Sequence, residues 1–216
     1  MRTPSVQGTG GVFSSLTDSL EEAIFVMKKM RTTKKLTTMA MLAALSIVLV
    51  TFIHFPLFPA AAFLEYDPAD IPIFIGTFLF GPLAGLSLTF VVAVIQGLTV
   101  SAGGQVIGII MHILATGSFA LLAGNLYKRY HTRKGALLAL ACGVLSMTVV
   151  MALCNLILTP IYMGTPVEAV LSMLVPVIIP FNLLKAGING IITYFVYKPI
   201  QNLVRWDTGA QMGQVS

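Results

Sequence analysis

Apolar residues fill long stretches of this chain, and the charged residues are confined to short blocks between them. The hydrocarbon core of a bilayer needs about 20 apolar residues of helix, so charge-free stretches of that length predict membrane spans. One stretch lies between Lys35 and Glu65, and its core, 36–55, is long enough for one span. Another runs from Asp70 to Lys128 without a charge, which is about 86 Å of helix, close to three hydrocarbon cores.

Turn-forming residues divide the long stretch. Gly81-Pro82 predicts one break and residues 101–104, Ser-Ala-Gly-Gly, predict another, which gives three short spans. A fifth span follows Lys134 and ends near Thr159-Pro160, and a sixth covers 173–197. The pattern therefore predicts an all-α integral membrane protein with six transmembrane helices.

Lysine and arginine placement predicts the orientation of these spans. The cations cluster before the first span, between the fourth and fifth, and after the sixth. Short cytoplasmic loops carry the excess of these residues, so both termini are predicted to be cytoplasmic. We expect a cytoplasmic N-terminal extension at 1–35, a six-helix transmembrane domain at 36–200 and a cytoplasmic tail at 201–216.

Composition excludes most soluble proteins. Of the 216 residues 56% are hydrophobic and 10% charged, whereas a soluble domain has about 25% charged residues. Mean hydropathy is +0.90. The net charge of +5 does not indicate a nucleic-acid-binding protein, because the cations form no single basic face. Cys142 and Cys154 are about 18 Å apart along a helix, too far for a disulfide.

Polar side chains recur within the predicted spans. Asn182, Lys185 and Asn189 follow intervals of three and four, which places them on one helix face. Shorter polar stripes occur on the third, fourth and fifth spans, among them Gln96, His112, Asn155, Thr159 and Tyr162. Such groups face a protein interior or a ligand cavity because an unpaired polar group in lipid is costly. Amides that merely join helices are the alternative for individual members.

Lys185 is the only cation within any predicted span. Nothing in its own helix turn neutralises it, so its partner is Asp67, Asp70 or a ligand. Pro180 fits the first turn of the same helix, where proline is tolerated.

The sequence lacks the common motifs of nucleotide-binding, metalloprotease and acyl-transfer enzymes. The sequence has no phosphate-binding G-x-x-x-x-G-K-[ST] loop, no H-E-x-x-H pair and no G-x-S-x-G turn. The three histidines are dispersed, so we expect neither a zinc site nor catalysis.

Several motifs occur in order along residues 36–200. They are Phe55-Pro56, Glu65–Pro72 (EYDPADIP), Thr77–Gly85 (TFLFGPLAG), Asn155 with Leu158–Tyr162 (LTPIY), and Ile179–Lys185 (IPFNLLK). With them the chain resembles the substrate-binding S component of energy-coupling-factor (ECF) vitamin transporters, most closely the riboflavin-specific member. The P-F-N-x-x-K stretch is the most specific of these motifs.

The resemblance implies a protein of the prokaryotic plasma membrane that captures riboflavin outside. It would deliver the vitamin inward while docked to a transmembrane coupling subunit and two ATPase subunits, with riboflavin as substrate and no cofactor. Asn155, Asn182 and Lys185 match positions that hydrogen-bond the vitamin, and Ala40 and Ala44 match a small-residue patch that packs on the coupling subunit.

Asp67, Gln96 and His112 complete the candidate substrate-binding set. Gln96 and His112 stand where close relatives are expected to carry lysine or asparagine. A flavin suits this composition, because its apolar ring fits Phe, Leu, Ile and Met while amides satisfy its hydroxyl tail. An S component for another vitamin and a non-transport membrane scaffold remain the alternatives.

Overall fold

The structure, a computed structural model, describes residues 9–58, 64–100 and 105–209. Residues 1–40 and 41–216 form two units, which are described separately. The helices are α1 (Thr9–Phe52), α2 (Asp70–Phe80), α3 (Pro82–Leu98), α4 (Gln105–Arg129), α5 (Arg133–Met163), α6 (Val167–Met173), the π-helix η3 (Leu174–Ile178) and α7 (Ile179–Gly209). The predicted break at 101–104 lies outside the described residues.

A short antiparallel hairpin precedes α2. Strand β1 (Phe55–Pro56) pairs with β2 (Glu65–Tyr66), with Phe55 opposite Tyr66. The two rings of that pair are 5.5 Å apart. Because β2 leads within a few residues into α2, the hairpin fixes where the intervening Asp67 enters the bundle.

Helix α2 is the most enclosed element of the second unit. Every residue from Asp70 to Phe78 is buried, and the helix packs against α3, α4 and α7. Phe74 stacks on Phe119 of α4, with ring centroids 3.5 Å apart. At the other end Gly81, with φ of 90°, adopts a conformation that favours glycine and reverses the chain. Pro82 then starts α3, at the break that the sequence predicted.

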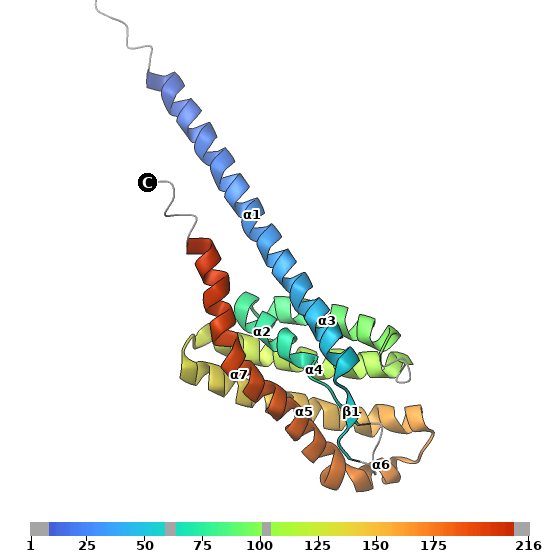
Figure 1. Cartoon of the computed structure of the whole chain (residues 1–216). Helices are drawn as coiled ribbons and strands as arrows, with labels where there is room; N and C mark the ends of the chain where they lie inside the picture. Colours follow the sequence, from blue (N-terminus) through green and yellow to red (C-terminus); the bar gives the residue numbers. More distant parts are fainter. Residues whose placement is uncertain (1–8, 59–63, 101–104, 210–216) are drawn as a thin grey trace, which may run out of the picture. The chain divides into compact units, whose positions relative to one another are not determined.

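Helices α3, α4 and α7 pack against this element, and α5 packs on α4 and α7. In sequence order α3 packs on α4, α4 on α5, and α5 on α7 (Figure 1). Small residues permit close approach: Gly143 of α5 faces the Phe119 ring, and Gly124 of α4 faces Pro82.

Two helix boundaries differ from the prediction. Helix α5 continues past Pro160 and ends where Gly164 adopts a φ of 63°. Glycine at this position accepts the left-handed conformation, so it ends the helix where proline did not. The last long helical region begins at Val167 rather than near 173, because a wider π turn, η3, accommodates Pro176 between α6 and α7.

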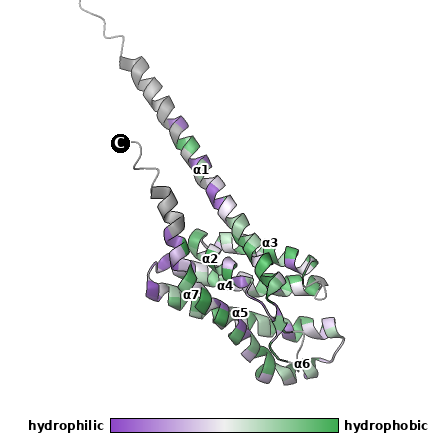
Figure 2. Cartoon of the chain, in the orientation of Figure 1, coloured by the Kyte–Doolittle hydropathy of each residue, from purple (hydrophilic) through white to green (hydrophobic). Residues whose placement is uncertain are grey.

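Hydropathy along the ribbon fits a lipid environment. Figure 2 shows mostly hydrophobic helices in the second unit, with hydrophilic residues at the turn between α4 and α5. Within the described residues four helical regions are long and apolar enough to cross a bilayer: 24–52, 106–129, 133–163 and 167–202. Helices α2 and α3 are also apolar but shorter.

We expect Gly124→Ala to destabilise the fold. An added Cβ would lie 2.9 Å from the Cα and Cβ atoms of Pro82, so α4 has to move away from α3. Such overpacking costs about 1–3 kcal/mol. Thermal unfolding of the detergent-purified protein measures this effect. Gly108→Ala is the matched control on the same helix, because a Cβ there has no atom within 4 Å; equal melting temperatures for the two variants would contradict the packing interpretation.

Candidate ligand cavity

A cavity of about 370 Å³ lies between the hairpin and helices α2, α3, α4, α5 and α7. This volume lies at the lower end of the range for small-molecule sites, about 300–1,000 Å³. The lining residues are Leu64, Glu65, Asp67, Asp70, Ala93, Gln96, Gly97, Val100, Ile107, Gly108, Ile109, Met111, His112, Ala115, Thr116, Met147, Met151, Asn155, Thr159, Tyr162, Phe181 and Lys185. Most of them are apolar, and the polar members come from every packed element.

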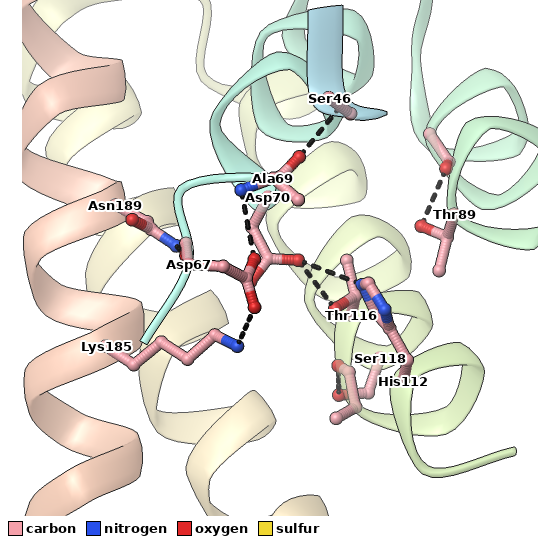
Figure 3. Close-up of polar contacts among 12 residues, drawn as sticks. Ser46, Asp67, Ala69, Asp70, Thr89, His112, Thr116, Ser118, Lys185 and Asn189 are labelled. Atoms are coloured by element: carbon pink, nitrogen blue, oxygen red, sulfur yellow. Dashed lines mark hydrogen bonds and ion pairs between the residues drawn. The ribbon is translucent and has the colours of Figure 1, made fainter. Parts of the chain in front are cut away.

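Lys185 closes one side of the cavity through an ion pair. Its Nζ lies 2.7 Å from Oδ2 of Asp67, with the two side chains 15% and 7% exposed (Figure 3). The ammonium also donates to the backbone oxygen of Glu65 at 3.4 Å. Of the three partners that the sequence allowed for this lysine, Asp67, Asp70 or a ligand, the structure shows Asp67.

The backbone around Asp67 is fixed by further hydrogen bonds. Asp67 Oδ1 accepts from the backbone N–H of Ala69 at 3.1 Å, and the backbone oxygen of Asp67 accepts from Nδ2 of Asn189 at 3.1 Å. The Tyr66 hydroxyl donates to Oδ1 of the same Asn189 at 3.1 Å. Burial, followed by the nearby charge of Asp67, raises the pKa of Tyr66, so this hydroxyl remains a donor.

The first turn of α2 is also tied to α1. The Ser46 hydroxyl donates to the backbone oxygen of Ala69 at 2.8 Å, and both groups are buried. Consequently the short segment between β2 and α2 is bonded to α1 on one side and to α7 on the other.

Asp70 carries a second polar cluster on the α4 side of the cavity. Its Oδ1 accepts from the Thr116 hydroxyl at 2.9 Å and lies 3.3 Å from Nε2 of His112. Thr116 lies one turn after His112 on α4, so both side chains reach the same carboxylate oxygen (Figure 3).

Helix α5 contributes an amide and hydroxyl wall. Thr159 donates to Oδ1 of Asn155 at 2.8 Å, and Asn155 Nδ2 donates to the backbone oxygen of Met151 at 2.9 Å. These bonds leave one N–H of the amide available to a ligand. Met147 and Met151 lie one turn apart beside them and offer polarisable apolar surface.

The structure brings five of the six predicted substrate-binding residues together. Asn155, Lys185, Asp67, Gln96 and His112 all line the cavity. Asn182 does not line it: its amide is buried and donates to the backbone oxygen of Ile178 at 2.8 Å.

The predicted partner patch lies apart from these residues in sequence. Ala40 and Ala44 are both exposed on α1.

Five polar lining residues were not in the predicted set: Glu65, Asp70, Thr116, Thr159 and Tyr162. For Thr116 and Thr159 the sequence offers one signal of cavity lining. Each hydroxyl lies four residues after a predicted site residue, His112 or Asn155, and therefore shares its helix face. That signal does not distinguish a cavity residue from a hydroxyl bonded within its own helix.

The cavity lining is suited to binding a ligand through hydrogen bonds. Among the described residues no group of three or more His, Cys, Asp or Glu side chains is placed to hold a metal ion. The polar lining groups are amides, hydroxyls and two charge-paired clusters, which suit an uncharged ligand that has both donors and acceptors.

Comparison with known proteins identifies the family. Residues 34–197 match the family described as "ECF transporter, substrate-specific component". The chain belongs to this family of transporter components. It is therefore a multi-pass membrane protein and not an enzyme, as the sequence predicted.

The curated relatives carry a consistent name. "Riboflavin transporter RibU" of Staphylococcus aureus is 31% identical over 82% of this chain and 95% of its own length. "Riboflavin transporter FmnP" of Bacillus subtilis is 30% identical over 76% of this chain and 90% of its own length. These matches cover nearly the whole of each relative.

Solved structures agree in fold. One titled "Structure and mechanism of the S component of a bacterial ECF transporter" has a TM-score of 0.69 at 32% identity, covering 80% of this chain and 98% of that one. ThiT from Listeria monocytogenes has a TM-score of 0.59 at 19% identity, covering 81% of this chain and 98% of its own, and supports the fold alone.

We expect Lys185→Met to destabilise the ligand-free protein by about 2–3 kcal/mol, because Asp67 loses its cation. Breaking a fully buried pair costs about 3–5 kcal/mol, and the partial exposure of Lys185 reduces that cost. Thermal unfolding without ligand is the measurement. The double variant Asp67→Asn with Lys185→Met removes both charges and should recover most of the loss; a double variant no more stable than the single one would exclude the ion pair as the cause.

Proposed function

We propose that this chain is the riboflavin-binding S component of an ECF-type vitamin uptake transporter. The observation that carries the proposal is the match, over nearly their full length, to relatives named riboflavin transporters. The proposed action is to capture riboflavin outside the cell and to deliver it inward when docked to an ATP-driven coupling module.

The cavity chemistry supports a flavin. A flat tricyclic ring needs a broad apolar surface, and the cavity offers Ile107, Ile109, Met147, Met151 and Phe181. A ribityl chain has several hydroxyls that both donate and accept hydrogen bonds. Amides match them because each carries both a donor and an acceptor.

We assign ligand contacts to the polar lining residues. Asn155 and Gln96 supply amides, Lys185 supplies a cationic donor to the ribityl hydroxyls, and Asp67 holds that donor in place. His112 supplies a contact from α4. Asn182 stays in the proposed set at the margin of the cavity, three residues from Lys185 and next to the lining residue Phe181.

We further propose six spans, with α2 and α3 as two short ones and both termini cytoplasmic. Support comes from the two ends of α4. His112 near its beginning faces the cavity, whereas Tyr127 near its end contacts Tyr197, with centroids 5.9 Å apart. The cations Lys128 and Lys198 follow those tyrosines at the end remote from the cavity, which suits a cytoplasmic side.

Domain limits and partners complete the proposal. Residues 1–35 form a cytoplasmic extension, 36–200 the substrate-binding domain and 201–216 a cytoplasmic tail. The partners are a transmembrane coupling subunit and two ATPase subunits. Ala40 and Ala44 form the contact with the coupling subunit, because both side chains are small and exposed on α1.

We expect one riboflavin to bind per protein, with the ligand in the cavity beside Asp67. Titration calorimetry of the detergent-purified protein with riboflavin, thiamine and biotin measures stoichiometry and preference. Preferential binding of another vitamin would favour an S component of different specificity. Binding of none of the three would favour a membrane scaffold.

Variants of α7 locate that binding. Lys185→Ala removes a charged donor and should weaken riboflavin binding roughly ten- to hundredfold. Asn182→Ala should weaken it less, because a neutral amide makes weaker bonds and Asn182 lies off the cavity lining. A Lys185→Ala protein that melts earlier without ligand but keeps its riboflavin affinity would mean that this lysine holds only Asp67.

Replacing both Ala40 and Ala44 by tryptophan should abolish riboflavin uptake by cells that express a complete transporter. The purified variant should bind riboflavin with unchanged affinity, because neither residue lines the cavity. Bulky side chains prevent the close helix approach that small residues permit. Replacement of the exposed Leu36 by tryptophan is the control on the same helix, and normal uptake by the double variant would exclude this face as the docking surface.

A further inference from the structure

Asp70 has an unusual position for a carboxylate. Its side chain is 2% exposed, at the start of α2. Its Oδ1 is the common acceptor for Thr116 and His112 (Figure 3). A carboxylate enclosed in this way requires a nearby cation or a set of strong donors.

The ring of His112 is oriented by this contact. Because an ionised carboxylate only accepts hydrogen bonds, the 3.3 Å contact places the N–H on Nε2 and leaves Nδ1 as the other polar atom. His112 lines the cavity, and its side chain is 18% exposed. Among residues 9–58, 64–100 and 105–209 no protein group hydrogen-bonds Nδ1.

The ionisable groups beside Asp70 are unequally close to it. Lys185 is paired with Asp67 at 2.7 Å, whereas His112 is the described lining residue able to carry a positive charge within hydrogen-bond distance of Asp70. Protonated His112 makes the Asp70 cluster electrically neutral and turns Nδ1–H into a donor. Loss of the proton converts Nδ1 into an acceptor.

We infer that Asp70 is a positioning residue that holds His112 as a cationic donor, and that Nδ1–H of His112 binds an acceptor of the ligand. The inference rests on the proposed function, and the acceptor class that suits it is a ring carbonyl of a flavin. Two donors of the same kind then hold the ligand from two sides. Lys185 of α7 is paired with Asp67, and His112 of α4 is paired with Asp70.

This assignment makes ligand affinity depend on pH. Histidine is the side chain that ordinarily changes charge between pH 5 and 8. The other titratable groups lining the cavity are Asp70 from α2, Glu65 and Asp67 from the hairpin segment, Tyr162 from α5 and Lys185 from α7. None of their residue types ordinarily titrates between pH 6 and 8, and α3 contributes no titratable group to the lining.

The experiment is the dissociation constant of riboflavin, measured by flavin fluorescence on the detergent-purified protein between pH 5.5 and 8.5. The wild-type affinity should fall about tenfold as pH rises, since a charged donor is lost. His112→Gln should bind at a constant, weaker affinity across the range. Asp70→Asn should bind at pH 6 as weakly as the wild type does at pH 8, because the histidine loses the carboxylate that pairs with its imidazolium.

Controls separate this inference from the proposed function. Thr89→Val removes a buried hydroxyl that bonds only the backbone oxygen of Gly85 and does not line the cavity, so it should keep the wild-type pH profile. A pH-independent wild type that binds riboflavin would overturn the inference alone, as would a wild-type profile in His112→Gln. That second variant decides the matter if Asp70→Asn does not fold. A wild type that binds no riboflavin at any pH would overturn the proposed function and this inference with it.

Discussion

Two buried carboxylates organise the second unit of this protein. Asp67 and Asp70 lie three residues apart on a segment that is buried from Tyr66 to Phe78, so each must find its partners within the protein. Asp67 finds Lys185 on α7, and Asp70 finds Thr116 and His112 on α4. The need of each carboxylate for a partner therefore fixes α4 and α7 relative to one short segment. The residues of both pairs line the cavity.

A membrane environment makes these pairs more consequential than similar contacts on a soluble surface. The outward faces of the helices carry many exposed apolar side chains, such as Leu145, Val149 and Leu153 of α5, which lipid can cover. Polar groups that faced the same side would have no water to bind. The polar side chains are consequently turned inward, where they leave a cavity able to hydrogen-bond a ligand from several directions.

The cavity and the residues proposed for docking belong to different elements of the chain. Cavity-lining side chains come from the hairpin segment and from α2, α3, α4, α5 and α7, whereas the small residues Ala40 and Ala44 belong to α1. One hydrogen bond, from Ser46 of α1 to the backbone oxygen of Ala69, joins α1 to the segment that carries both carboxylates. This separation suits a family whose members are the substrate-specific components of larger transporters.

The sequence by itself determined the class of the protein and much of its helix plan. A long charge-free stretch crosses lipid as a helix because the helix satisfies all its backbone hydrogen bonds within the segment. Gly81-Pro82 marked the break between α2 and α3 because that backbone conformation is local. Helix periodicity placed Lys185 and Asn155 on inward faces, because an unpaired polar group that faces lipid is costly. The end of α5 was predicted too early, since Pro160 is less decisive than the following Gly164, and the π turn around Pro176 gave no local signal.

Only the tertiary structure decided which polar residues share the cavity. Asn182 and Lys185 lie on one helix face, yet only Lys185 lines the cavity, because Asn182 bonds its own backbone at Ile178. Lys185 pairs with Asp67 and not with Asp70 because of the path that the chain takes between β2 and α2. The same path pairs Asp70 with His112, 42 residues away. Sequence spacing reports which face of a helix a side chain occupies, whereas contacts between distant segments depend on how all the helices pack together.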